Sequence, residues 1–408
     1  MRVLVLTQVL VYPADAGPKI KTLQVLRHLA THHQVVYCTF IRSIKEIPYV
    51  EELGGIACCC RVSTVPIERS RASDIRFLLE SLVTGDSFLL RRDDCNVMRS
   101  IVSQLLYEEL IDVLHVDQLN MMRFVPAGWS GTVILDEHNA VWQVVERLRK
   151  GTRNPISRWF LGREARLIRK LEGTACQRSQ VVLAVSEQDK QALQEVAGES
   201  VSIKVVPITV DVKSFDAIWG ARNPQPDRLL TIGTMFWPPN SEGVIWWLRN
   251  GYESLRAICP DLIYDIVGPR PPRALQALAK RCKGINLRGY IADVVPFWTS
   301  ATALVVPLLS GGGVRVKILE AMAMGLPVIS TTIGCEGLAV RNGEHLLVAD
   351  TPDAFVNACV MLLQDRELTH HLALNARRLV LERYDAQVAL QALNDVYEEV
   401  VVYRTFES

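Results

Sequence analysis

The chain alternates short apolar runs with longer amphipathic stretches along almost its whole length. Runs rich in β-branched residues, such as Val3–Leu6, are too short for helices and have the composition of buried strands. The stretches between them repeat apolar side chains at helical spacing, as in Ile20–Ala30 and Arg99–Leu110. Strands that alternate with helices in this way are typical of parallel sheets covered by helices on both faces, so the pattern predicts an α/β fold.

The predicted strands form two groups, one in each half of the chain. Those expected in the first half are Val3–Leu6, Gln34–Cys38, Arg61–Val65, Val113–Val116, Val133–Asp136, Val181–Val185 and Ile203–Val206. Those expected in the second half are Leu229–Ile232, Leu262–Val267, Ile285–Arg288, Ala303–Val306, Pro327–Ser330 and His345–Val348. Two groups indicate two sheets, and therefore two Rossmann-like doubly wound domains facing a central cleft.

A polar segment separates the two groups of strands. Glycine and proline residues within 211–227 interrupt both the strand pattern and the helical spacing of apolar residues, and we expect the interdomain linker there. The predicted domains are then residues 1–210 and 228–385. A final helical stretch within 386–408 lies beyond the last strand, in a position from which it can pack back across the linker.

Composition excludes several classes of protein. A length of 408 residues exceeds what one core usually serves, and an apolar fraction of 49% suffices for two cores. The 45 basic and 44 acidic side chains leave a net charge of +1, which argues against a nucleic-acid partner. No stretch approaches the roughly 18 to 20 apolar residues of a membrane-spanning helix, so we expect a soluble or peripheral protein.

The ten cysteines show no spacing typical of a metal site or of a disulfide framework. A reducing cytosol fits this pattern best, which predicts a cytoplasmic location. Cys58, Cys59 and Cys60 are adjacent, and we interpret the run around them as a buried strand in which cysteine acts as a small apolar residue.

The most informative segment is PLLSGGGVRVKILEAMAMGLPVIS, residues 307–330. It contains three consecutive glycines, Gly311, Gly312 and Gly313. They allow the backbone to approach a ligand, and the helix expected next directs free N–H groups and its positive dipole end to the same point. Arg315 and Lys317 add charges that a diphosphate would compensate, and Glu320 lies one turn later, where a ribose could bind. The alternative is a simple turn followed by a solvated charged pair.

The motif GGGVRVKILEAMAMGLPVIS resembles the donor-binding signature of the retaining GT-B glycosyltransferases of the large fourth family, the glycosyl transferases group 1. Further matches follow in order: AVSEQD at 184–189, VVPITVD at 205–211, TIGTMFWPPN at 231–240, DIVG at 265–268, LRGYIAD at 287–293 and GCEGL at 334–338. The resemblance implies a nucleoside-diphosphate-sugar donor bound mainly by the second domain and an acceptor bound mainly by the first. It also implies retention of anomeric configuration, and neither a metal nor another cofactor.

Within the second domain, the resemblance implies that Glu320 binds the ribose. Gly233 and Glu336 follow expected strands and are further candidates for the donor site, although a surface or helix-capping role suits Glu336 equally well. The sequence departs from many relatives at two places. Gly312 stands where they have a first glutamate facing the donor sugar, as in a subgroup with triple glycine, and 233–240 lacks their basic pair.

The first domain carries candidates at the expected carboxyl ends of its strands, the edge where open α/β sheets bind ligands. Gly17, in PADAGPK, would line the cleft beside the donor phosphates; the alternative is a plain turn. His138 matches a family histidine near the donor sugar, although a lone histidine is often a satisfied structural group. Asp117 and Asn139 are expected on the acceptor side, and an Asp in such a place also commonly caps a turn.

Residues 147–170 hold nine basic side chains against the single acid Glu164, with Trp159 and Phe160 interleaved. A basic amphipathic helix of this kind fits an anionic membrane surface. The alternative is a solvated basic face with its aromatic side chains in the core of the first domain.

These interpretations combine into one functional hypothesis. The chain is expected to move a sugar from a nucleoside-diphosphate donor to a hydroxyl of a glycan, lipid-linked or small-molecule acceptor. Arg315 and Lys317 would stabilise the leaving diphosphate, and His138 would act near the sugar. A catalytically degenerate partner subunit is the alternative suggested by Gly312, and a non-hydrolysing sugar-nucleotide epimerase is a second alternative with the same fold.

Overall fold

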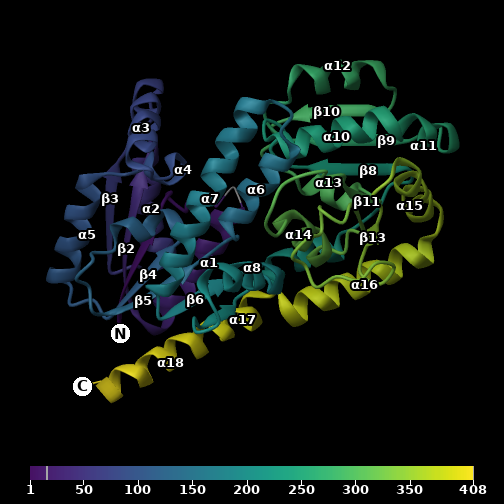
Figure 1. Ribbon diagram of the computed structural model, residues 1–408. Coiled ribbons are helices and arrows are strands. Elements are labelled where there is room, and N and C mark those ends of the chain that lie inside the picture. Colours follow the sequence, from purple (N-terminus) through teal and green to yellow (C-terminus); the bar gives the residue numbers. More distant parts are fainter. Residues whose placement is uncertain (15–16, 408) are drawn as a thin grey trace. The chain divides into compact units, whose positions relative to one another are not determined.

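The computed structural model describes residues 1–14 and 17–407, with side chains described up to residue 400. The chain divides into two compact units (Figure 1). Unit 1 comprises Met1–Pro207 and Leu390–Ser408, and unit 2 comprises Ile208–Ala389. Each unit contains one parallel sheet with helices on both of its faces, which confirms an α/β fold with two Rossmann-like domains.

The sheet of unit 1 has seven strands in the order β3-β2-β1-β4-β5-β6-β7. Their bounds are β1 (Arg2–Thr7), β2 (Gln34–Ile41), β3 (Arg61–Pro66), β4 (Val113–Asp117), β5 (Thr132–Asp136), β6 (Val181–Ala184) and β7 (Ile203–Val205). Strands β4 and β5 are buried at every position because helices cover both faces of the sheet.

Helices connect these strands and complete unit 1. They are α1 (Gly17–His32), α2 (Ile47–Ala57), α3 (Arg71–Thr84), α4 (Phe88–Arg91), α5 (Asn96–Glu108), α6 (Val141–Gly151), α7 (Pro155–Gln177), α8 (Glu187–Ala197) and α18 (Gln391–Glu407), with the 3-10 turns η1 (Ile44–Glu46) and η2 (Leu119–Phe124). Helix α18 returns to this unit from the end of the chain. Its Tyr397 hydroxyl lies 3.0 Å from His115 Nδ1, and Asn394 Oδ1 lies 2.7 Å from His28 Nε2.

The sheet of unit 2 has six strands in the order β10-β9-β8-β11-β12-β13. Their bounds are β8 (Arg228–Ile232), β9 (Ile263–Val267), β10 (Ile285–Gly289), β11 (Ala303–Val306), β12 (Val328–Ser330) and β13 (Leu347–Val348). The helices are α9 (Asp216–Gly220), α10 (Pro238–Asn250), α11 (Tyr252–Ile258), α12 (Arg273–Arg281), α13 (Val295–Ser300), α14 (Val316–Ala323), α15 (Pro352–Gln364), α16 (Arg366–Arg383) and α17 (Ala386–Ala389), with the 3-10 turn η3 (Val212–Phe215).

All thirteen strands expected from the sequence are present in these two sheets, with ends that differ by three residues or fewer. The strand order reverses between β1 and β4 in unit 1, and between β8 and β11 in unit 2. Ligands of doubly wound sheets bind at the carboxyl ends of the strands, where the order reverses. Each unit therefore has one place at which a ligand is expected.

Other local expectations change. Residues 211–227, expected as a linker, contain η3 and α9 and belong to unit 2, where Arg222 donates hydrogen bonds to the carbonyl oxygens of Trp298 and Ala301. The prediction of a buried strand at the cysteine triplet is wrong. Helix α2 ends on Cys58, in the left-handed region with φ of 52°, because the chain has to turn before β3 begins at Arg61.

Within the described residues, no helix combines the length and the apolar character needed to cross a membrane.

Candidate functional site

The glycine-rich loop of unit 2 lies where the strand order reverses, between the end of β11 and the start of α14. Gly311 and Gly313 have φ of 115° and 78°, values at which a side chain would be strained. Arg315 is the N-cap residue of α14, and its guanidinium donates hydrogen bonds to the carbonyl oxygens of Gly312 and Gly313. The helix therefore begins at Val316, and Arg315 closes the loop instead of lying inside the first helical turn as expected.

Lys317 extends from the first turn of α14 toward the loop that follows β8. Its Nζ lies 3.2 Å from Asn240 Oδ1, and a Cβ atom added to Gly233 would lie 3.3 Å from the same Nζ. No carboxylate of the described residues pairs with this ammonium. Burial, and in second place the charge of Arg315, lower the pKa of Lys317 to about 7. An anion bound here would supply the missing counter-charge.

Glu320 lies three residues after Lys317 on α14, and its side chain is partly buried. Burial raises the pKa of Glu320 to about 7. None of the described residues forms a hydrogen bond with its carboxylate, so both oxygens remain available to a ligand's hydroxyl groups. Glu336 is partly buried in the turn after β12, the strand next to β11 in the sheet.

Two groups at this edge were missed at the sequence level. Asn240, at the start of α10, accepts the hydrogen bond from Lys317. Arg270, from the loop after β9, places its guanidinium carbon 3.8 Å from the ring centroid of Phe236. A cation thus reaches the 233–240 loop from a segment about thirty residues away. A lone asparagine and a distant arginine carry no pattern that could have revealed either contact.

In unit 1, the structure brings His138 and Asp117 together at the carboxyl ends of β5 and β4. His138 Nε2 lies 2.9 Å from Asp117 Oδ1, and His138 Nδ1 lies 3.2 Å from the side-chain nitrogen Nε2 of Gln118. Thr22, on α1, donates a hydrogen bond of 2.9 Å to the same Asp117 oxygen. Both His138 and Asp117 are buried, so the imidazole is held in one orientation.

Asp117 and His138, together with Asp136, also form the one group of described side chains with metal-ligand geometry. One ligand atom from each lies within 4.8 Å of the others. A buried ammonium, that of Lys21, is hydrogen-bonded to Asp136. Although burial opposes it, Lys21 holds the pKa of Asp136 well below its usual range. The charge of Asp136 is therefore compensated from within the chain, and the sequence expectation of no metal remains an expectation.

The other two candidates predicted in unit 1 are Asn139 and Gly17. Asn139 follows His138, and its side-chain oxygen is buried without a hydrogen-bond partner among the described residues. Gly17 is the first residue of α1, and residues 15 and 16 lie outside the described part. Glu137, which precedes His138 at this edge, is buried; burial, and then the charge of Glu172, raise its pKa well above the usual value.

A family model agrees with the geometry of unit 2. Residues 226–365, which include β8, β11 and α14, match the model described as glycosyl transferases group 1. In this region the chain is similar to the group 1 glycosyl transferases. The recognition made from the sequence is confirmed at the level of a glycosyltransferase with the GT-B fold, and retention and the triple-glycine subgroup stay predictions.

Similar proteins are found in several bacteria. This glycosyltransferase is 27% identical over 173 residues to a Klebsiella pneumoniae protein described as an uncharacterized 44.6 kDa protein in the cps region, a match that spans 41% of this chain and 45% of the relative. It is 22% identical over 325 residues to the Escherichia coli UDP-Gal:alpha-D-GlcNAc-diphosphoundecaprenol alpha-1,3-galactosyltransferase, across 75% of this chain and 80% of that enzyme.

Solved structures share the complete architecture of this glycosyltransferase. Sucrose-phosphate synthase from Thermosynechococcus elongatus superposes with a TM-score of 0.71 at 15% identity, over 99% of this chain and 100% of the other. Anabaena HepE in complex with UDP and glucose gives a TM-score of 0.69 at 12% identity, over 98% of this chain and 100% of the other. At these identities the likeness establishes the fold alone.

Proposed function

We propose that the chain is a retaining, metal-independent transferase that moves a sugar from a nucleoside-diphosphate donor to a hydroxyl of a lipid-linked acceptor. The observation that carries the proposal is the ammonium of Lys317, which lacks a counter-ion at the loop after β11 while the free carboxylate of Glu320 follows three residues later on the same helix. A nucleoside diphosphate offers an anion for the first group and ribose hydroxyls for the second.

The donor diphosphate binds at the glycine-rich loop in this proposal. Gly311 and Gly313 let the backbone come close, and the free N–H groups at the start of α14 point to the same place. Lys317 and Arg315 supply the charge, Glu320 holds the ribose, and Glu336 lies on the donor side. Gly233 adds space beside Lys317, because a side chain there would press on Nζ.

The leaving diphosphate gains negative charge as the bond to the sugar breaks. Cations and helix N–H groups already in place stabilise that charge without reorganisation, and such preorganised stabilisation commonly provides a large part of an enzyme's rate enhancement. His138, oriented by Asp117, would act near the sugar, with Gly17 on the donor side and Asn139 on the acceptor side. The position corresponding to the family's first glutamate is Gly312, so the proposed retention proceeds without a carboxylate nucleophile from that position.

A lipid-linked acceptor is favoured by the relatives. The Escherichia coli enzyme carries diphosphoundecaprenol in its name, and the Klebsiella protein is encoded in a cps region. A transferase that acts on such lipids in the cytoplasm would contribute to the biosynthesis of a surface polysaccharide or a glycoconjugate.

The proposal is tested by incubating the purified protein with UDP, GDP, ADP and TDP sugars, an excess of chelator and a detergent-solubilised diphosphoundecaprenol-linked sugar. We expect nucleoside diphosphate release that depends on acceptor, and NMR of the product should show the anomeric configuration of the donor. Lys317→Met should abolish turnover, whereas Lys280→Met, which changes an exposed lysine on α12, should not.

Three results would contradict parts of this assignment. Donor conversion without acceptor would identify an epimerase instead. Nucleotide binding without turnover on any acceptor of a broad panel would indicate a degenerate partner subunit. Loss of turnover in chelator, with recovery on addition of Mg²⁺, would overturn metal independence.

A further inference from the structure

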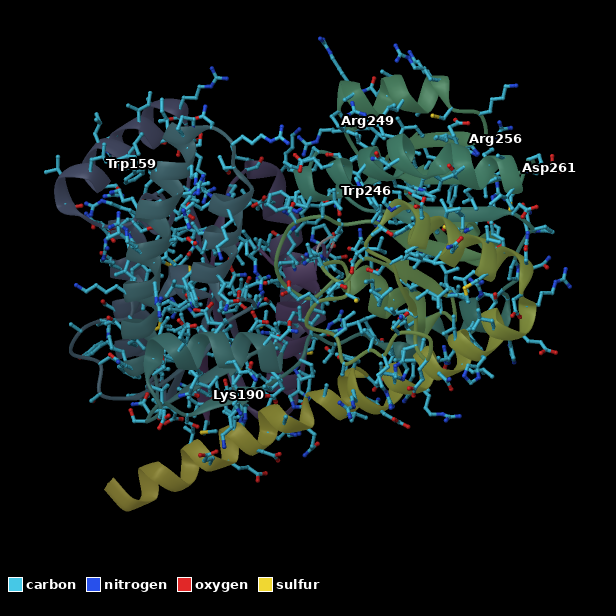
Figure 2. The ribbon with its side chains drawn as sticks, turned by 45° about the vertical axis from the view of Figure 1, so that its right-hand side comes forward. Trp159, Lys190, Trp246, Arg249, Arg256 and Asp261 are labelled. Atoms are coloured by element: carbon cyan, nitrogen blue, oxygen red, sulfur yellow. The ribbon has the colours of Figure 1, made fainter. Side chains whose placement is uncertain are left out.

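The basic segment 147–170 belongs to two helices and not to the single helix expected from the sequence, because residues 152–154 turn the chain between α6 and α7. Trp159, near the start of α7 (Figure 2), has an exposed fraction of 62%, so the expectation that it lies in the core is wrong. Phe160 is partly buried, with its ring 6.1 Å from that of Phe88. The fit of this segment to an anionic membrane surface stays a prediction.

The turn between the two helices brings the last part of α7 back to the start of α6. Glu172, on α7, accepts hydrogen bonds from the backbone N–H groups of Val141 and Trp142, at 2.7 and 3.1 Å, one through each carboxylate oxygen. Ala140 is the N-cap residue of α6, and its methyl side chain cannot accept a hydrogen bond. Glu172 therefore supplies, from another helix, the acceptor that a serine or an aspartate usually supplies at an N-cap.

A second carboxylate, that of Asp189 on α8, binds the N–H group of the preceding residue. Asp189 Oδ1 accepts a hydrogen bond of 3.1 Å from the backbone N–H of Ala140. Asp189 Oδ2 accepts a hydrogen bond of 2.5 Å from the hydroxyl of Ser186, the N-cap residue of α8, which orients the carboxylate. The consecutive N–H groups of residues 140–142 are thus bound by two acids that come from two other helices.

These N–H groups directly follow the residues that are expected to act on the sugar and the acceptor. On the other side of those residues, the backbone N–H of Glu137 donates a hydrogen bond of 2.9 Å to the carbonyl oxygen of Leu183, on β6. Between Glu137 and Ala140 lie only His138 and Asn139. Because the chain is bound at both ends of this pair, the two carboxylates help to determine where the pair lies.

Burial distinguishes Glu172 from an ordinary helix cap. Its side chain has no exposed surface, and burial, opposed by the hydrogen bonds from Trp142 and Val141, raises its pKa to about 7. A buried carboxylate costs free energy that a serine at position 140 would not cost. A local rule broken in this way is typical of a functional site.

We propose that Glu172 and Asp189 are positioning residues for sugar transfer, which hold His138 and Asn139 in the places from which these act on the sugar and the acceptor. The proposal rests on the function proposed above, in which His138 acts near the sugar. In Glu172→Gln, one oxygen would be replaced by an NH₂ group that donates hydrogen bonds and cannot accept one from a helix N–H, so the segment has to move. A displacement of about 1 Å at a reacting group can cost about hundredfold in rate.

The test compares Glu172→Gln and Asp189→Asn with the wild type by turnover and by NMR. Turnover is measured with the nucleotide sugar and the diphosphoundecaprenol-linked acceptor for which the wild type is active. NMR of protein with isotope-labelled histidine follows the ring of His138, whose signal is identified by its absence in His138→Gln. We expect kcat to fall by between about tenfold and about hundredfold and the His138 signal to shift. Stabilisation by the nucleotide, which is proposed to bind in unit 2, should stay unchanged.

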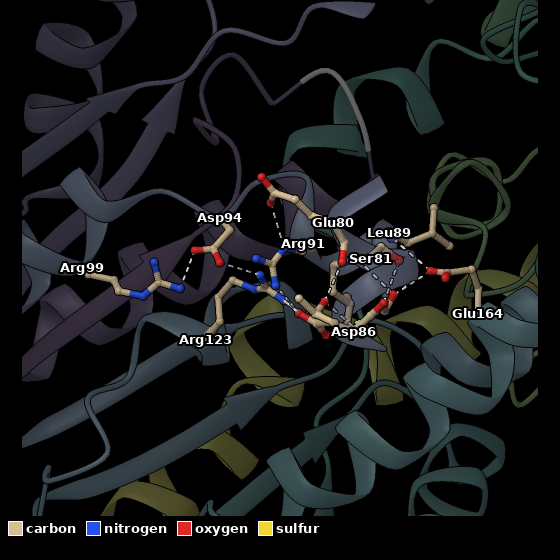
Figure 3. A network of polar contacts seen from close by, with 12 residues as sticks. Glu80, Ser81, Asp86, Leu89, Arg91, Asp94, Arg99, Arg123 and Glu164 are labelled. Carbon is tan, nitrogen blue, oxygen red and sulfur yellow. Dashed lines mark hydrogen bonds and ion pairs between the residues drawn. The ribbon is translucent and has the colours of Figure 1, made fainter. Parts of the chain in front are cut away.

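The matched control is Glu164→Gln, which makes the same change at another buried glutamate of α7 (Figure 3). Glu164 accepts hydrogen bonds of 3.1 Å from the backbone N–H of Leu89 and of 2.7 Å from the hydroxyl of Ser87, at the start of α4. The control should lower the free energy of unfolding, as the test variants do. It should leave kcat and the His138 signal unchanged, because Glu164 has no printed bond to the segment after β5.

An unchanged kcat or an unchanged His138 signal in the folded variants would overturn the proposal and leave the two acids as helix caps only. Equal effects in Glu164→Gln would also overturn it, because they would report lost stability alone. If His138→Gln keeps full turnover, the proposed role of His138 is wrong and the positioning role fails with it, although the donor site in unit 2 is untouched. Should Glu172→Gln not fold, Asp189→Asn decides, since that acid is partly exposed.

Discussion

Binding of a nucleoside diphosphate should draw a proton from solution onto Lys317. In the free protein, burial and the neighbouring Arg315 lower the pKa of this ammonium to about 7, against a usual value of 10.5. A diphosphate in contact with Nζ favours the charged form and returns the pKa to its usual value or above. Above pH 7, Lys317 is therefore mostly neutral before binding and charged after it.

The number of protons taken up follows from the pKa of Lys317 before and after nucleotide binding. At pH 8, a group with a pKa of about 7 is protonated in roughly 10% of molecules, and one with the usual value is protonated in nearly all, so about 0.9 proton is taken up. Glu320, whose pKa is about 7, is already mostly ionised at pH 8 and adds little. Because binding consumes a proton, the affinity should fall by almost tenfold for each pH unit above 8.

Isothermal titration calorimetry measures this uptake when the same titration is repeated in buffers of different ionisation enthalpy. Lys317→Arg is the matched variant, because an arginine stays charged at every accessible pH and still binds phosphate. It should bind the nucleotide without taking up a proton. If the wild type takes up none at pH 8, or if Lys317→Arg takes up as much, Lys317 does not face the diphosphate and the reasoning fails.

Two further predictions concern the packing that holds the sites. Gly268→Ala would place a Cβ atom 1.8 Å from the carbonyl oxygen of Gly233, so the loop beside Lys317 must move. We expect a loss of about 3 kcal/mol in the free energy of unfolding and weaker nucleotide binding. Gly220→Ala, whose added Cβ atom meets open space, should leave thermal unfolding unchanged. Tyr397→Phe removes the 3.0 Å hydrogen bond to His115 and should lower the free energy of unfolding, measured by urea titration, by about 1 kcal/mol. An unchanged urea midpoint would show that this hydrogen bond does not stabilise the packing of α18 in unit 1.

The strands were predictable because parallel strands buried on both faces are continuous apolar runs that polar segments separate. The same reasoning failed at Cys58, because a run of small apolar side chains has the composition of a buried strand, whereas the backbone turns there. It also could not show that Ile75 and Leu79 lie on the surface. Amphipathic spacing identifies the apolar face of a helix, and only the packed structure shows what that face meets.

The candidate site was predictable where one segment carries all of its chemistry. The loop and helix from Gly311 to Glu320 lie at the expected edge of the sheet because a glycine-rich turn and a helix start are local features. The sequence did not reveal contacts between segments that are far apart in the chain. The bond from Lys317 to Asn240 and the position of Arg270 over Phe236 depend on the order of the strands in space.

Unit 2 is proposed to bind a nucleoside diphosphate through Lys317 and Glu320. The most direct test of this binding compares thermal unfolding with UDP, GDP, ADP and TDP, in the presence of chelator, for the wild type and for Lys317→Met/Glu320→Gln. The control is Lys280→Met/Glu253→Gln, which makes the same changes at exposed positions of α12 and α11. We predict that one nucleotide stabilises the wild type and the control but not Lys317→Met/Glu320→Gln. Stabilisation of all three proteins to the same extent, or of none by any nucleotide, would contradict the claim.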